Sequence, residues 1–128
     1  MDRQVIATAN APAAVGPYSQ AIKVGGMVFT AGQIGIDPQA KKLVAGGVEA
    51  QTRQTLTNLK NILEAAGTSM ANVVKVTVFL QDIQDFQAMN QVYAEFFPDA
   101  PPARAAAQVA ALPLGAAVMI ETVAAIVE

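Results

Sequence analysis

The feature that most constrains this chain is the segment VVKVTVFL at residues 73–80, which lies between two helical patterns. Val, Thr and Phe dominate it, and these residue types favour extended strands. Apolar side chains fall on both alternating faces, with Val74, Val76, Val78 and Leu80 on one face and Val73 and Phe79 on the other. A strand that is apolar on both faces is predicted to lie inside a sheet rather than at its edge.

Two amphipathic helices are predicted, one before and one after this segment. Residues 48–66 carry apolar residues at spacings of three and four, namely Leu56, Leu59, Leu63 and Ala66, and Gly67 follows at the C-cap position. Residues 82–97 show the same spacing at Phe86, Met89, Tyr93 and Phe96, with Asp82 or Asp85 as N-cap and Pro98 as the stop. Each helix therefore has one apolar face to bury.

Further strands are predicted at residues 3–8, 20–24, 27–34, 103–111 and 117–127, with Gly25-Gly26 as a two-residue hairpin turn. The order strand-strand-strand-helix-strand-helix-strand-strand predicts an α+β domain in which two helices cover one face of a mixed β-sheet. No helix of this chain is left for the other face, although the strands carry apolar residues on both. We therefore expect that face to pack against another subunit.

The residue types that the chain lacks narrow its chemistry. Its 128 residues, expected to form a single domain over residues 1–128, include no Cys, no His and no Trp. This excludes disulfides, thiol nucleophiles, Ser-His-Asp triads and the commonest metal ligand. Any chemistry must therefore use carboxylates, Arg, Lys, Tyr, Ser or Thr, amides, the backbone or bound water.

Charge and hydropathy exclude other classes of partner. The eight Lys and Arg residues are scattered and the formal net charge is -2, which disfavours nucleic-acid binding. No apolar run approaches the length of a membrane span, and the N-terminal residues do not form a signal peptide. We expect a cytoplasmic protein without a membrane partner.

Arg104 stands among alanines in PPARAAAQVAA, residues 101–111, and is the first candidate for a ligand-binding residue. Small neighbours leave room around a long guanidinium, whose planar fork suits a carboxylate or a phosphate. The alternative is an arginine at the start of a strand that extends into solvent.

Glu121 is the second candidate, because it interrupts the apolar segment VMIETVAAIV, residues 118–127. By strand alternation it shares a face with Met119, Val123 and Ala125. A carboxylate on such a face costs stability unless it is paired or hydrogen-bonded, and it could act as general acid or base or activate a water. The alternatives are an edge-strand residue that faces water and a structural ion pair with Arg104.

Three further positions give weaker signals. Tyr18 follows Gly16 and Pro17 in a rigid loop, where its ring stacks on a ligand or fills an apolar gap. Asn90 lies on or beside the apolar face of the second helix, and its amide ties the helix to a loop or reaches a pocket. Gly32 in TAGQIG allows a ligand to approach the backbone or marks a β-bulge. Together these candidates indicate a small-anion site without a metal.

Over almost its whole length the chain resembles the RidA/YjgF family of reactive-intermediate deaminases, also known as the L-PSP endoribonuclease family. The segments that carry the resemblance are NAPAAVGPYSQA, TAGQIG, QTRQTLTNLKNILEAAG, VVKVTVFLQDIQDFQAMNQVYAEFF and PPARAAAQVAALPLGAAVMIE. The resemblance implies a chorismate-mutase-like α+β fold and a homotrimer with ligand sites in the clefts between subunits. It also implies cofactor-free hydrolysis of 2-imino or 2-enamino acids, such as 2-iminobutanoate and 2-iminopropanoate, to 2-keto acids and ammonia.

The same resemblance assigns roles to residues. Arg104 would bind the substrate carboxylate, and Glu121 would hold the water that attacks the imine carbon. The remaining substrate-binding positions are Tyr18, supplied by a neighbouring subunit, and Ala31, Gly32, Asn90 and Ala106. Many family members have Ser at position 31, Cys at 106 and Glu at 119, where this chain has Ala31, Ala106 and Met119. Any activity of this chain therefore proceeds without that thiol.

Three other functions are alternatives. The first is RNA cleavage or translation inhibition, which the missing His and the net charge of -2 argue against. The second is a non-catalytic protein that binds a 2-keto acid or acts like a chaperone. The third is chorismate mutase, whose dianionic substrate would need more basic residues than Arg104 alone.

Overall fold

The segment VVKVTVFL is strand β6 (Val73–Leu80), an interior strand of a six-stranded sheet in the computed structural model, which describes residues 2–127. The other strands of this sheet are β1 (Arg3–Ile6), β2 (Ala21–Val24), β3 (Met27–Thr30), β7 (Ala103–Gln108) and β8 (Val118–Ala125). The helices are α1 (Gly47–Ala65) and α2 (Phe86–Phe96). Short 3-10 turns occupy Met70–Asn72, Ile83–Asp85 and Pro113–Gly115, and β4 (Ile36–Asp37) pairs with β5 (Lys42–Leu43) in a separate hairpin.

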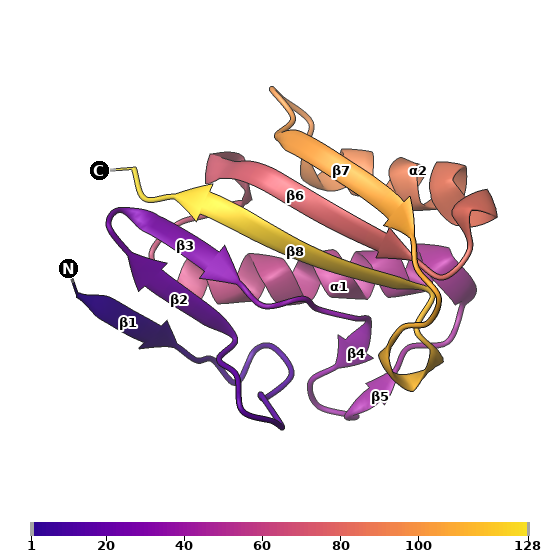
Figure 1. Cartoon of the computed structure of the whole chain (residues 1–128), viewed down its shortest axis with the longest axis horizontal. Helices are drawn as coiled ribbons and strands as arrows, with labels where there is room; N and C mark the ends of the chain where they lie inside the picture. The colour runs from indigo at the N-terminus through magenta and orange to yellow at the C-terminus, as the bar shows by residue number, and fades with distance from the viewer. Residues whose placement is uncertain (1, 128) are drawn as a thin grey trace.

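The sheet is mixed and has the strand order β1-β2-β3-β8-β6-β7. Only β6 and β7 run parallel, because α2 connects them as a crossover, whereas all other neighbours are antiparallel. Figure 1 shows both helices on the same side of the sheet, with α1 behind β3 and β8 and α2 near β6 and β7. This confirms the predicted α+β domain with two helices on one face.

The hydrophobic core fills the space between the helices and the sheet. Its fully buried members include four residues of α1, namely Leu56, Leu59, Ile62 and Leu63, and four of the sheet, namely Val76, Val78, Val118 and Ile120. The buried residues recur every three or four positions along α1 and every second position along β6 and β8, as the sequence pattern predicts. None of the helices in the described chain is long and apolar enough to span a lipid bilayer.

Two β-bulges shift the predicted strand faces. In β6 the register with β8 slips between Val73 and Lys75, so that Val73 is buried and Val74 is 45% exposed. The prediction that Val74 shares the buried face with Val76 is therefore wrong, because the extra residue reverses the alternation at that point. The second bulge lies between Phe29 and Gln33. It shortens the strand predicted over residues 27–34 to β3, which ends at Thr30.

The segment predicted as one helix over residues 82–97 is divided in the structure. Ile83–Asp85 form a 3-10 turn, in which the Asp82 side chain accepts a hydrogen bond from the backbone N–H of Gln84, and α2 begins at Phe86. Asp82 is therefore the capping residue of the turn, and Asp85 makes no side-chain cap. The β4–β5 hairpin was not predicted, because its strands have two residues each and show no alternation.

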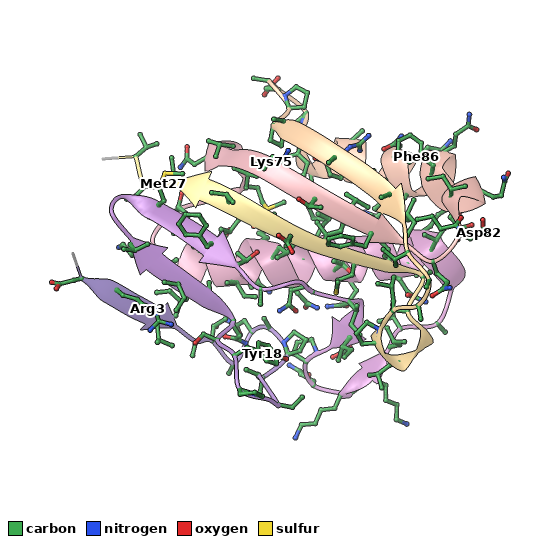
Figure 2. The ribbon with its side chains drawn as sticks, in the orientation of Figure 1. Arg3, Tyr18, Met27, Lys75, Asp82 and Phe86 are labelled. Carbon is green, nitrogen blue, oxygen red and sulfur yellow. The ribbon has the colours of Figure 1, made fainter. Side chains whose placement is uncertain are left out.

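Within residues 2–127, both helices cover one face of the sheet and the second face carries none, as expected. Cross-strand partners place the apolar side chains of this uncovered face in adjacent rows: Ile22, Val24, Met27, Phe29, Phe79, Met119, Val123 and the alanines of β7 at 103, 105 and 107. Arg3, Lys75 and Glu121 lie in the same rows. Figure 2 shows this face toward the viewer, with the helices behind it.

Candidate active site

Arg104 lies on the edge strand β7, on the side of the sheet that the helices cover. It pairs across the sheet with Val76, a fully buried core residue, so both side chains point toward α2. Its guanidinium carbon lies 4.7 Å from the centre of the Tyr93 ring and 5.3 Å from the centre of the Phe86 ring, within the range of cation–π contacts. The side chain is partly buried by the helix rather than extended into solvent.

Asn90 holds this guanidinium in place. Nη1 of Arg104 donates a hydrogen bond of 2.6 Å to Oδ1 of Asn90, one helical turn from Phe86. Asn90 therefore ties α2 to β7 instead of tying the helix to a loop. Whether it also contacts a substrate stays a prediction. Ala106, two residues from Arg104, faces the same side and packs against the core.

Tyr93 is a residue that sequence reasoning treated as core only. Burial raises the pKa of Tyr93, and the nearby positive charge of Arg104 acts in the opposite direction. Its hydroxyl is buried and has no partner in the described chain at hydrogen-bond geometry, although Arg104 lies close enough to act against the rise in its pKa. The spacing of Phe86, Asn90 and Tyr93 places them on one helix face, but ordinary core residues have the same spacing, so the sequence did not single out Tyr93.

Glu121 lies on the opposite, uncovered face of the sheet. It pairs with Thr77, which in turn pairs with Ala105, whereas Arg104 lies in the neighbouring row with Val76 and Thr122. Neighbours in one row share a face and successive rows alternate, so Arg104 and Glu121 point in opposite directions. The predicted alternative of an ion pair between them is excluded within one chain. Glu121 is exposed, and no residue of the described chain hydrogen-bonds its side chain.

Gly32 lies at a β-bulge beside Glu121. From Phe29 to Gln33 the chain advances four residues, while the paired strand advances only three from Val123 to Ile120. The bulge interpretation is therefore correct. A Cβ atom at Gly32 would lie 3.0 Å from the Met119 sulfur, so this backbone is covered by a side chain of the uncovered face. Bulges open backbone groups and are frequent beside active sites.

Tyr18 lies on the loop that precedes β2 and is 52% exposed (Figure 2). It lines an open groove of about 550 Å³ together with Arg3, Phe29 and Ala31. Backbone N–H of Tyr18 donates to the carbonyl of Gly16, which forms a tight turn. The ring is therefore presented at the margin of the uncovered face and does not fill an apolar gap.

Gln20 fixes the loop that carries Tyr18 and was missed in the sequence. Its buried amide accepts a hydrogen bond of 2.7 Å from the N–H of Thr8 and donates to the carbonyls of Thr8, Ala11 and Pro12. The four backbone groups that this buried amide contacts receive from it the hydrogen bonds that regular secondary structure would otherwise supply. The position of Gln20 directly after GPYS was the available signal.

The predicted site residues thus form two groups in one chain. Arg104, Asn90 and Ala106 lie on the helix-covered side at β7, whereas Tyr18, Ala31, Gly32 and Glu121 lie around β3 and β8 toward the uncovered face. The first group supplies a fixed cation, and the second supplies a free carboxylate and an exposed aromatic ring. Among residues 2–127 no three His, Cys, Asp or Glu side chains are placed to hold a metal ion.

Comparisons with known proteins agree with this fold. Residues 8–126 match the profile of the family described as Endoribonuclease L-PSP. A 2-iminobutanoate/2-iminopropanoate deaminase of Capra hircus is 54% identical over 122 residues, which cover 95% of this chain and 89% of the relative. The crystal structure of RidA from an Antarctic Psychrobacter is 50% identical with a TM-score of 0.93 and covers 96% of this chain and 99% of its own. That of E. coli TdcF with bound serine is 42% identical with a TM-score of 0.92, covering 95% and 98%.

Proposed function

Because this chain belongs to the Endoribonuclease L-PSP family, which includes RidA and YjgF, we propose that it is a 2-iminobutanoate/2-iminopropanoate deaminase. Mammalian relatives with this name are 52–54% identical to it over 95% of the chain. The reaction adds water to the C=N bond of a short 2-imino acid and yields a 2-keto acid and ammonia. The family profile over residues 8–126 supports a single domain for the whole chain, 1–128, and we expect the enzyme to act in the cytoplasm.

The observation that carries the proposal is the fixed guanidinium of Arg104. Asn90 accepts one of its N–H groups, and the others stay available for a bidentate pair with a carboxylate. Every 2-imino acid has a carboxylate next to its imine carbon. A cation that is held before the substrate arrives therefore orients the reacting carbon as well as binding the molecule.

Glu121 is the proposed residue that holds the attacking water. A water positioned by this carboxylate adds its oxygen to the imine carbon while its proton passes through Glu121 to the imine nitrogen. The resulting carbinolamine then loses ammonia as Glu121 transfers the hydroxyl proton to the amine nitrogen, the C–N bond breaks and the C=O bond forms. One proton relay of this kind contributes about 10²–10⁴-fold, and protein groups alone supply it.

The proposed site would need a second copy of the chain, since Arg104 and Glu121 point away from each other in one copy. We propose a homotrimer of chorismate-mutase-like architecture, in which each cleft combines Arg104, Asn90 and Ala106 of one subunit with Tyr18, Ala31, Gly32 and Glu121 of the next. The apolar, uncovered sheet face supports an assembly, because exposing a large apolar patch to water is unfavourable and such patches mark protein interfaces. Sedimentation at several protein concentrations tests it, and a monomer at all of them would exclude it.

A coupled assay tests the activity. A threonine dehydratase releases the imine, semicarbazide traps it, and an active deaminase suppresses formation of the semicarbazone. We expect Arg104→Ala to lower kcat/KM by about 100-fold, because a charge-assisted bidentate pair is lost. The control is Lys60→Ala, which removes an exposed cation from α1. Equal suppression by wild type and Arg104→Ala would refute the assignment of Arg104.

A further inference from the structure

Three side chains on one face of α2 surround the guanidinium of Arg104. Phe86, Asn90 and Tyr93 are spaced by four and three residues, so they lie one above another along the helix. The two rings contact the guanidinium at 5.3 Å and 4.7 Å, and Asn90 accepts its hydrogen bond at 2.6 Å. The arginine is thus restrained both by ring contacts and by a hydrogen bond.

We propose that Tyr93, with Phe86, is a positioning residue that fixes the Arg104 guanidinium for a substrate carboxylate. This inference rests on the proposed function. The ring of Tyr93 performs this role, since the guanidinium lies 4.7 Å from the ring centre and the hydroxyl has no partner at hydrogen-bond geometry among residues 2–127. Tyr93 is itself held in the core, where its ring packs against Phe97 at a centroid distance of 4.7 Å.

The physical reason is the flexibility of a free arginine. A solvated arginine side chain populates many rotamers, and binding a ligand would have to select one of them. Ring contacts remove that freedom in advance, and the N–H groups not used by Asn90 keep their in-plane directions. Loss of a ring should therefore weaken carboxylate binding even though neither ring need touch the substrate.

Two substitutions at Tyr93 separate the ring from the hydroxyl. Tyr93→Phe keeps the ring, and we expect the dissociation constant of 2-ketobutyrate, a stable product analogue, to stay within about twofold of wild type in calorimetry. Tyr93→Leu removes the ring, and a lost cation–π contact should raise that constant and KM by about threefold to thirtyfold while kcat changes less. A Phe variant as weak as the Leu variant would overturn the role of the ring.

Phe96→Leu is the matched control, since it also removes a partly buried ring from α2 but one without a contact to Arg104. It should change thermal stability without changing the affinity for 2-ketobutyrate. If Tyr93→Leu does not fold, Phe86→Leu tests the same proposal from a less buried position. Affinity within twofold of wild type in the folded Leu variant at either ring position would overturn the proposal.

Arg104→Ala distinguishes this failure from failure of the proposed function. If Arg104→Ala binds 2-ketobutyrate as wild type does, the carboxylate site itself is wrongly assigned. If only Arg104→Ala loses binding and Tyr93→Leu keeps it, the site is right and the positioning role is wrong.

A spectroscopic readout follows from composition. The chain has two Tyr and no Trp, so Tyr18→Phe leaves Tyr93 as the sole tyrosine. Saturating 2-ketobutyrate should then give a tyrosine difference spectrum, because an anion at Arg104 changes the field at the adjacent ring. This signal should be absent when Arg104→Ala is added, and its absence in Tyr18→Phe alone would contradict the contact.

Discussion

Arg104 and Glu121 lie on strands separated only by β6, yet their surroundings differ. Arg104 faces α2, where two rings and an amide restrain it. Glu121 faces away from both helices, is exposed, and has no hydrogen-bond partner in the described chain. The cation is therefore arranged by the fold of a single subunit. The position and partners of the carboxylate instead depend on the molecule that covers the second face of the sheet. This is the main reason to expect a site shared between subunits.

Glu121→Gln should have the largest effect on the reaction. Without a group to accept and return a proton, we expect kcat to fall by about 10²–10⁴-fold in the coupled semicarbazide assay. Binding of 2-ketobutyrate should change much less, because Arg104 is intact. Glu64→Gln, an exposed carboxylate on α1, is the control. Unchanged kcat in Glu121→Gln would exclude the water-holding role.

Mixing two inactive variants tests whether the two sides of the sheet meet between subunits. After Arg104→Ala and Glu121→Gln chains are unfolded together and refolded as an equal mixture, some clefts combine an intact Arg104 with an intact Glu121. Random assembly should restore about a quarter of wild-type activity. The separately refolded variants are the controls. If the mixture stays inactive while refolded wild type recovers its activity, the proposal that Arg104 and Glu121 of one cleft come from different copies is wrong.

Substitutions of two neighbouring residues of β8 show how much each face of the sheet contributes to the free energy of unfolding. Ile120 is fully buried beneath the helices, and Ile120→Ala should lower the free energy of unfolding by about 2–5 kcal/mol in urea. Met119 lies on the uncovered face, and Met119→Ala should cost the isolated chain only about 1 kcal/mol. Sedimentation should show weaker self-association for Met119→Ala. Similar self-association in Met119→Ala and wild type would argue that this part of the face is not an interface.

The smallest expected effect concerns the ion pair between the helices. Arg53 donates two hydrogen bonds to Glu95, which lowers the pKa of Glu95 below its usual value. A depressed folded-state pKa stabilises the fold above the unfolded pKa, and this contribution is lost as the pH falls through the folded pKa. Glu95→Gln should therefore be slightly less stable than wild type at pH 7. The difference should shrink as the pH falls below the ordinary glutamate pKa and vanish as it falls through the lowered pKa of Glu95.

Salt provides the check on this last prediction, because exposed ion pairs are screened. The difference in Tm between wild type and Glu95→Gln at pH 7 should shrink as salt is added, whereas Glu64→Gln should show no such trend. A pH-independent difference would mean that Gln perturbs packing rather than the charge pair.

Much of the fold could be predicted from local patterns. The bounds of β6 agree with the predicted segment, and Gly67 has the positive φ of 89° that a helix C-terminus favours. Gly25 and Gly26 both have positive φ in the β2–β3 turn, as the hairpin signal requires. The errors in the predicted strand faces and strand ends arise at β-bulges, where one strand has an extra residue. The bulges at Val74 and near Gly32 shift the alternation of side chains, and no residue type in the sequence signals them.

The candidate site was only partly predictable. Arg104 and Glu121 were identifiable because each charge interrupts an apolar or alanine-rich strand. The strand face of Glu121 followed from alternation along β8. The partners of Arg104 were not identifiable, because Phe86 and Tyr93 have the same spacing as ordinary core residues.

The sequence by itself determined the elements, the single helix-covered face and the chemistry that an absence of Cys and His allows. These depend on residue type and on periods of 2 and 3.6 residues, which are local properties. Only the tertiary structure decided that Arg104 lies under α2 and that Glu121 points the other way. That outcome depends on the register of β6 with β7 and β8, which is set by packing between segments far apart in the chain.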